Sequence, residues 1–194
     1  SYANLYANSP FMFGDQFTLS TLYTQEQMWY GTAGYSLPLG SSGLRGTVGY
    51  THSYYELGKD FASLDARGTV DIASAGVSYP LMRSQQANLT ASATYQHKWL
   101  VDKQGSAGTD NDKNSDSLPI ALAFDRRDTL GEGGITYGTL SWTPGVLDLD
   151  EGLKSTDSTT AKSDGYFNKV NLDVARLQAL PQGFTLFARA SGQW

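Results

Sequence analysis

The stretch that decides the fold is Asn88-Leu-Thr-Ala-Ser-Ala-Thr-Tyr-Gln-His-Lys-Trp99. Its odd positions, from Leu89 to Trp99, are apolar or aromatic apart from the imidazole of His97, whereas every even position carries a polar side chain. Neighbouring side chains of a β-strand point to opposite faces. The stretch therefore predicts a strand with one apolar and one strongly polar face.

The same two-residue period recurs along the whole chain, and helical periodicity is hard to find. Together these segments predict ten strands, with no second kind of element between them. The positions that mark the other nine strands are Leu5/Ala7, Phe17/Leu19/Tyr23, Ala33/Tyr35/Leu37, Leu44–Tyr54, Ala73/Ala75/Val77/Tyr79, Leu118/Ile120/Leu122/Phe124, Leu140/Trp142, Val170/Leu172/Val174 and Phe184–Trp194.

The links between these segments alternate between two kinds. One kind is short, the other is mostly longer and very polar, and only the tight link Thr24–Gln27 breaks the contrast. In an antiparallel meander this alternation places tight turns at one rim and long, solvated loops at the other, as in outer-membrane barrels. The short links are Ser9–Asp15, Pro38–Gly43, Pro80–Gln86, Asp128–Gly134 and Leu180–Gly183, and the long ones are Glu56–Arg67, Val101–Ser117 and Leu147–Tyr166.

Composition narrows the function classes. A net charge of −5 argues against a nucleic-acid partner, which would need a basic face to meet phosphates. The absence of cysteine excludes a disulfide scaffold and a thiolate metal site. No apolar run approaches the roughly 18 residues of a membrane helix. Ser1 begins within alternating sequence, so a cut or processed N-terminus is expected.

A soluble antiparallel sandwich also alternates, with its apolar face turned inward. Two features favour a membrane barrel instead: one face of each strand is as polar as a water-filled lumen requires, and the strands reach the roughly 9–11 residues of a tilted membrane strand. Aromatic residues near strand ends are typical of the girdle at a bilayer boundary. They are Trp29, Tyr54, Tyr55, Trp99 and Trp142. The expected fold is an all-β, antiparallel, up-and-down transmembrane β-barrel.

Several segments resemble, in order along the chain, the barrel domain of the two-partner-secretion transporters, the hemolysin secretion/activation proteins. They are Asn8-Ser-Pro-Phe-Met-Phe-Gly-Asp-Gln-Phe17, Tyr35-Ser-Leu-Pro-Leu-Gly40, Tyr54-Tyr-Glu-Leu-Gly58, Tyr79-Pro-Leu-Met-Arg-Ser84, Phe124-Asp-Arg-Arg-Asp-Thr-Leu-Gly131, Pro144-Gly-Val-Leu-Asp-Leu149, Val174-Ala-Arg-Leu-Gln178 and Ser191-Gly-Gln-Trp194.

The resemblance implies a sixteen-stranded barrel in the bacterial outer membrane, preceded by two POTRA domains and a plug helix. Such transporters capture an unfolded exoprotein in the periplasm and thread it outward. Residues 1–194 then form a barrel segment of about ten strands, and the POTRA domains, plug helix, signature lumen loop and later strands are not part of it. No functional residue of the family can be carried over, because those residues lie in the missing parts. The alternative is an autonomous ten-stranded barrel acting as an enzyme or adhesin, and a soluble β-sandwich adhesin domain is the third reading.

No catalytic, metal or cofactor site is expected. His97 lies near Asp102 in sequence, but an interfacial role beside Tyr95 and Trp99 suffices for it. Asp110, Asp112 and Asp116 resemble a loose calcium loop, without the glycine turn and terminal glutamate that such a loop needs. Gly131-Glu-Gly-Gly134 opens no helix, so a tight turn is expected rather than a phosphate cradle.

The polar face is the expected functional surface, because charges that face lipid cost roughly 2–4 kcal/mol near the midplane. In a conduit, hydroxyl and amide groups offer many weak hydrogen bonds to a passing extended chain. The expected partners are the secreted, unfolded polypeptide and outer-membrane lipid, with no nucleic acid. The candidate lumen-lining residues are Gln16, Thr18, Arg45, Thr47, Thr90, Thr94, Gln96, Lys98, Arg127, Arg189 and Gln193.

Overall fold

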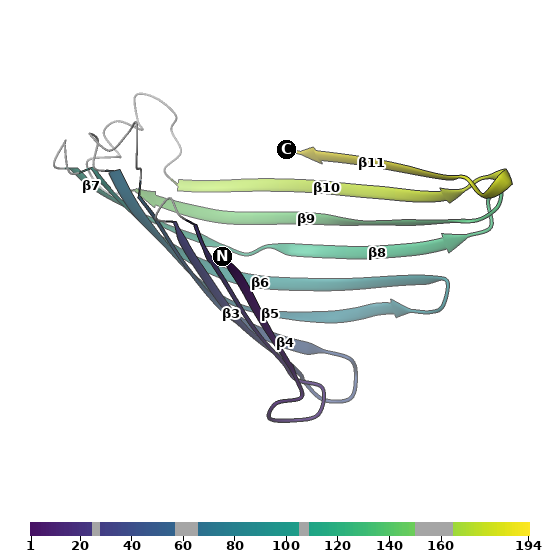
Figure 1. Cartoon of the computed structure of the whole chain (residues 1–194), viewed down its shortest axis with the longest axis horizontal. Helices are drawn as coiled ribbons and strands as arrows, with labels where there is room; N and C mark the ends of the chain where they lie inside the picture. Colours follow the sequence, from purple (N-terminus) through teal and green to yellow (C-terminus); the bar gives the residue numbers. More distant parts are fainter. Residues whose placement is uncertain (25–27, 57–65, 105–108, 150–164) are drawn as a thin grey trace.

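The computed structural model describes residues 1–24, 28–56, 66–104, 109–149 and 165–194. They form one antiparallel sheet of eleven strands. The alternating sequence predicts the antiparallel sheet, but with ten strands. Figure 1 shows the sheet curving from its first strands, which run obliquely, to its last, which run horizontally. The strands are β1 (Tyr2–Asn8), β2 (Gln16–Tyr23), β3 (Trp29–Pro38), β4 (Arg45–Glu56), β5 (Ala66–Arg83), β6 (Ala87–Gln104), β7 (Thr109–Ser117), β8 (Ile120–Asp128), β9 (Gly134–Leu149), β10 (Gly165–Ala179) and β11 (Thr185–Gln193).

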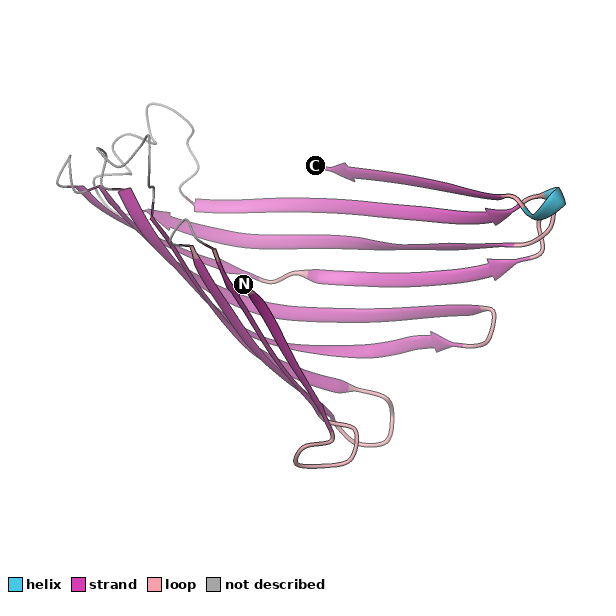
Figure 2. Cartoon of the chain, in the orientation of Figure 1, coloured by secondary structure: helices cyan, strands magenta, loops and turns pink. Residues whose placement is uncertain are grey.

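Short turns join the strands along one rim of the sheet, at the right and lower edge of Figure 1. They fall at or next to the predicted short links, except that β5 continues to Arg83 and takes up the first half of the predicted link Pro80–Gln86. The antiparallel meander is confirmed. Figure 2 shows one short helix in the described part of the chain, the 3₁₀ turn η2 (Pro181–Gly183) between β10 and β11. Within the described residues, no helix is long and apolar enough to cross a membrane.

The two outermost strands each have a neighbour on one side only. Within the described ranges, β1 pairs with β2 and β11 pairs with β10, and neither has a further partner. The sheet is therefore open at both edges in this structure. Closure into a barrel is not observed and stays a prediction.

The strand count exceeds the predicted ten because an additional strand, β7, lies within the predicted loop Val101–Ser117. β7 and β8 both pair with β6 on one side and with β9 on the other. Their register is continuous, since Ser117 lies opposite Gln96 and Ile120 lies opposite Ala93. Pro119 falls between them and has no N–H to donate to the ladder. The additional strand β7 is thus the first half of a strand that Pro119 divides from β8.

Replacing Pro119 by alanine is expected to close this break. The amide of Thr94 donates to the carbonyl of Pro119 at 2.9 Å, but the return bond lacks a donor. An alanine amide supplies it, and a bond of about 1 kcal/mol should slow hydrogen exchange of the neighbouring amides about fivefold. Pro144 on β9 accepts from the amide of Leu118 at 2.9 Å and lacks the same return donor, so Pro144→Ala is a parallel test. Unchanged exchange in both variants would contradict this account.

The predicted loop Val101–Ser117 is wrong for most of its length. β6 continues to Gln104, and β7 begins at Thr109. β7 consists of Thr, Asp, Asn, Lys and Ser, so both of its faces are polar and no apolar period marks it as a strand. In the other links, residues 25–27, 57–65 and 150–164 lie outside the described residues, as do 105–108 here.

The sheet has no second layer packed on it among the described residues. Leu149 and Ala175 are the only apolar residues there that are buried, while many large apolar side chains of the strands stay exposed. Val48, Tyr50 and Leu186 are each at least half exposed. An apolar surface of this extent needs a cover, which for a sheet of this kind is lipid or protein.

Candidate functional site

Strand register divides the sheet into two faces, because residues that lie opposite each other on paired strands point to the same side. We call the side that carries Thr94 the polar face and the side that carries Ala93 the apolar face. Thr94 lies opposite Gly76, and Ala93 lies opposite Val77. The pairing can be followed from strand to strand across the whole sheet.

All eleven predicted lumen-lining residues fall on the polar face. They come from five strands: Gln16 and Thr18 from β2; Arg45 and Thr47 from β4; Thr90, Thr94, Gln96 and Lys98 from β6; Arg127 from β8; and Arg189 and Gln193 from β11. They therefore form an extended surface and not a pocket. That this surface lines a lumen stays a prediction.

Arg45 is held at the start of β4 by polar groups of earlier strands. Its guanidinium donates to the hydroxyl of Ser36 at 2.8 and 3.1 Å and to the carbonyl of Gly14 at 3.1 Å. No carboxylate takes part in this contact, so its positive charge is oriented without being neutralised.

Tyr55 departs from the predicted aromatic girdle, because its register places it on the polar face. Its ring lies across Gly68 of β5, where an added Cβ would come within 2.5 Å of ring atoms. Its hydroxyl donates to Asp102 Oδ1 on β6 at 2.5 Å. Strand periodicity does not predict this link between β4 and β6, because the link depends on a glycine in the intervening strand.

The apolar face holds two clusters that sequence reasoning missed. In the first, Tyr50 and His52 on β4 both contact Asp71 Oδ1 on β5, at 2.6 and 2.5 Å. The imidazole of His52 also lies 5.2 Å from the Trp29 ring, centroid to centroid. Shared contacts of this kind keep an acid on an apolar face hydrogen-bonded.

The second cluster repeats the first with the same sequence spacing. Tyr95 and His97 on β6 both contact Asp116 Oδ1 on β7, each at 2.5 Å. The aspartate follows its histidine by 19 residues in both clusters, which is a signal the sequence contained. His97 therefore pairs with Asp116, whereas Asp102 lies on the opposite face.

The acidic segment that resembled a calcium loop is part of strand β7. Asp116 is occupied by Tyr95 and His97, and the side chain of Asp110 lies outside what the structure describes. In the described part of the chain, no three His, Cys, Asp or Glu side chains gather as metal ligands would. Gly131–Gly133 end the β8–β9 turn, with φ of 60° at Gly131 and 92° at Gly133, and Gly134 begins β9.

A separate hydrogen-bond network, distinct from the two clusters, lies at the short-turn rim of the apolar face. Arg176 on β10 makes a bidentate ion pair with Asp128 at 2.7 and 2.9 Å and donates to Thr136 at 2.7 Å. Gln178 donates to the carbonyls of Leu130 and Gly133, both at 2.9 Å. These bonds tie the β8–β9 turn to β10.

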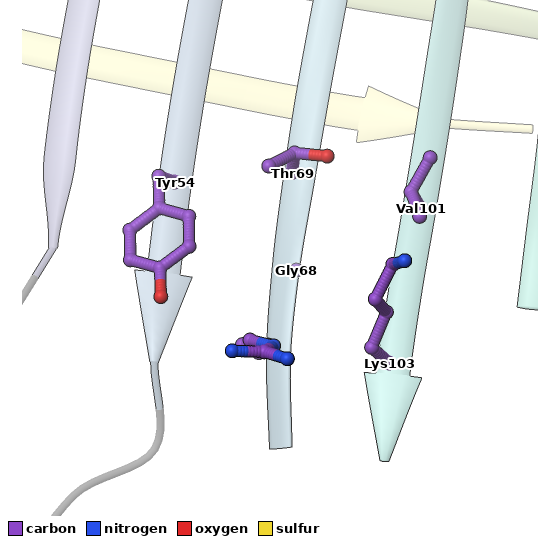
Figure 3. Close-up of a pocket in the computed structure, with 6 residues that line it drawn as sticks. Tyr54, Gly68, Thr69, Val101 and Lys103 are labelled. Carbon is purple, nitrogen blue, oxygen red and sulfur yellow. The ribbon is translucent and has the colours of Figure 1, made fainter. Parts of the chain in front are cut away.

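Aromatic and basic residues meet on the apolar face toward the opposite rim. Trp29 and Tyr54 lie opposite each other on β3 and β4, and both are predicted girdle residues. Beside them, Tyr54, Arg67, Gly68, Thr69, Val101 and Lys103 line a cavity of about 270 Å³. Figure 3 shows Tyr54, Thr69 and Val101 on three adjacent strands, with Lys103 nearer the strand end. Aromatic rings with long basic side chains beyond them are typical of a membrane boundary.

Residues 1–194 match the family of haemolysin secretion/activation proteins ShlB/FhaC/HecB. The chain belongs to this family. Its members are outer-membrane transporters that secrete partner proteins, and they are not enzymes. The chain is also 27% identical over 152 residues to the heme/hemopexin transporter protein HuxB of Haemophilus influenzae strain 86-028NP, and 26% identical over 149 residues to HuxB of a further H. influenzae source. Each match covers about three quarters of this chain, 76% and 75%, but only 26% of the relative.

Proposed function

We propose that this chain forms part of the wall of an outer-membrane translocator that passes an unfolded partner protein through a polar lumen. The observation that carries the proposal is the segregation of the two faces over eleven strands, which supports lipid on the apolar side and water on the polar side. Family membership supports the same activity. The partner is a secreted polypeptide, and the curated relatives suggest a heme- or hemopexin-related one.

The unpaired edges of β1 and β11 support closure with further strands. A sheet edge exposed to lipid leaves backbone N–H and C=O groups without partners, which costs several kcal/mol each. The family resemblance puts the complete barrel at sixteen strands. In this arrangement residues 1–194 supply a barrel segment, and the polar face of the segment becomes part of the inner wall.

Cysteines introduced at two neighbouring positions can test which face contacts the secreted polypeptide. The chain contains no cysteine, so each introduced thiol is unique within it. Thr94→Cys on the polar face is expected to react with a water-soluble maleimide and to cross-link to a secretion-arrested partner. Ala93→Cys, one residue away on the apolar face, is expected to do neither.

The full transporter should be used, embedded in outer membranes and co-expressed with its partner. Labelling and cross-linking at position 93 instead of 94 would reverse the face assignment. Labelling at 94 and not at 93 in a sheet that is soluble without detergent would favour the β-sandwich alternative, whose apolar face is turned inward. Equal labelling at both positions would contradict the division into an apolar and a polar face.

A further inference from the structure

The polar face is basic, although the whole chain has a net charge of −5. In the described strands, register places seven basic and only three acidic residues on this face. The basic residues are Arg45, Arg83, Lys98, Lys113, Arg127, Lys169 and Arg189, and the acidic residues are Asp102, Asp125 and Asp173.

The apolar face shows the opposite sign. Its acidic residues outnumber its basic residues, so the two signs are sorted across the thickness of the sheet and not merely scattered. The acidic residues are Glu56, Asp71, Asp112, Asp116, Asp128 and Asp148, against the basic residues Arg67, Lys103, Arg126 and Arg176.

The three carboxylates of the polar face are all engaged by neighbours. Asp173 is paired with Arg189 at 2.7 Å. Asp125 accepts a hydrogen bond from the side-chain amide of Asn88 at 3.1 Å. Asp102 accepts from Tyr55 at 2.5 Å. The negative charge on this face is therefore partly neutralised or already hydrogen-bonded.

Most of the positive charge on the polar face is not balanced in this way. Among the described residues, only Arg189 of the seven basic residues has an ion-pair partner. Arg83 and Arg127 lie at the short-turn rim, Lys98 lies within β6, and Lys113 and Lys169 lie nearer the other rim. Positive charge thus extends along the polar face from rim to rim.

We propose that this face selects acidic polypeptide: it forms a positively charged path that attracts acidic segments of the passenger and admits anions in preference to cations. The inference rests on the proposed function and specifies its substrate chemistry. A wall of low dielectric constant focuses the field of fixed charges into the adjacent water, which raises the local concentration of counter-charged solutes. Because lysine and arginine side chains are long and mobile, they can follow a moving chain without trapping it.

The two arginines Arg126 and Arg127 provide a matched test. They are adjacent on β8, yet Arg127 lies on the polar face and Arg126 on the apolar face. The full transporter, reconstituted in planar bilayers, would be measured for anion-to-cation selectivity in a KCl gradient and for block by polyglutamate or polylysine of equal length.

We expect anion selectivity in the unmodified protein, and block by polyglutamate at a concentration about tenfold lower than by polylysine. Arg127→Glu should reduce both preferences severalfold, and Arg126→Glu should leave them unchanged. Equal block by the two polymers, or equal effects of the two substitutions, would overturn the inference. If the partner is still secreted in that case, the proposed function stands without it. A protein that neither conducts nor secretes would contradict both.

Discussion

Arginine in place of Ala91 is expected to destabilise the inserted transporter by about 2–4 kcal/mol, whereas arginine in place of Ala121 is expected to be tolerated. The two alanines lie on adjacent strands, one step apart in the ladder that joins β6 and β8. Ala91 is on the apolar face opposite Leu122, and Ala121 is on the polar face opposite Ser92. A guanidinium held against lipid near the midplane costs about 2–4 kcal/mol, and one that faces water costs little.

The measurement is the free energy of unfolding of the full transporter in lipid vesicles, followed by urea titration. Ala91→Arg should lower it by the full amount, and Ala121→Arg by less than about 1 kcal/mol. Lysine at the same two positions should repeat the contrast, because a lysine that faces lipid costs a similar amount, about 2–4 kcal/mol, near the midplane. Equal losses at both positions would contradict the assignment of the two faces to lipid and to water.

Alanine in place of Asp15 should lower the free energy of unfolding about as much as Ala91→Arg does, but by removing hydrogen bonds. Asp15 lies in the β1–β2 turn and is the one polar residue that is fully buried in the described part of the chain, with 0% exposure. Its Oδ2 accepts from the Tyr35 hydroxyl at 2.6 Å and from the amides of Phe11 and Met12 at 3.3 and 3.2 Å. Removing this acceptor leaves three donors without their hydrogen-bond partner, which should lower the free energy of unfolding by about 3 kcal/mol.

Asparagine in place of Asp15 removes the negative charge but keeps the size of the side chain and one acceptor oxygen. Asp15 Oδ1 has no hydrogen-bond partner among the described residues, and Oδ2 accepts all three bonds. An asparagine oxygen can therefore take the place of Oδ2, and its amide nitrogen can take the place of Oδ1. Asp15→Asn should retain most of the unfolding free energy that Asp15→Ala loses. If both variants lose it equally, the negative charge holds the turn, and the hydrogen-bond acceptor alone does not.

Sequence reasoning recovered the strands wherever one face is apolar. Ten alternating segments gave the antiparallel meander and the faces of residues such as Thr94 and Ala93, because a period of two is set by backbone geometry alone. It failed in β7, where Asp112 and Lys113 make both faces polar and periodicity carries no information. It also missed that Pro119 divides a strand without shifting its register.

The polar surface was predictable as a set, but its contacts were not. Alternation places Arg45 and Arg127 on one side, yet it cannot say that Arg45 is held by Ser36 while Arg127 has no ion pair among the described residues. The Tyr55–Asp102 bond spans an intervening strand and depends on Gly68. Such links need three-dimensional register, which no single segment contains.

The paired clusters on the apolar face suggest how this wall could have lengthened. Tyr50, His52 and Asp71 on one hairpin correspond to Tyr95, His97 and Asp116 on the next, with the same 19-residue interval between histidine and aspartate. The repeated unit is two strands, the smallest insertion that keeps both rims and both faces in place. A barrel that lengthens by such units gains circumference in steps of two strands and keeps the same inner and outer surfaces.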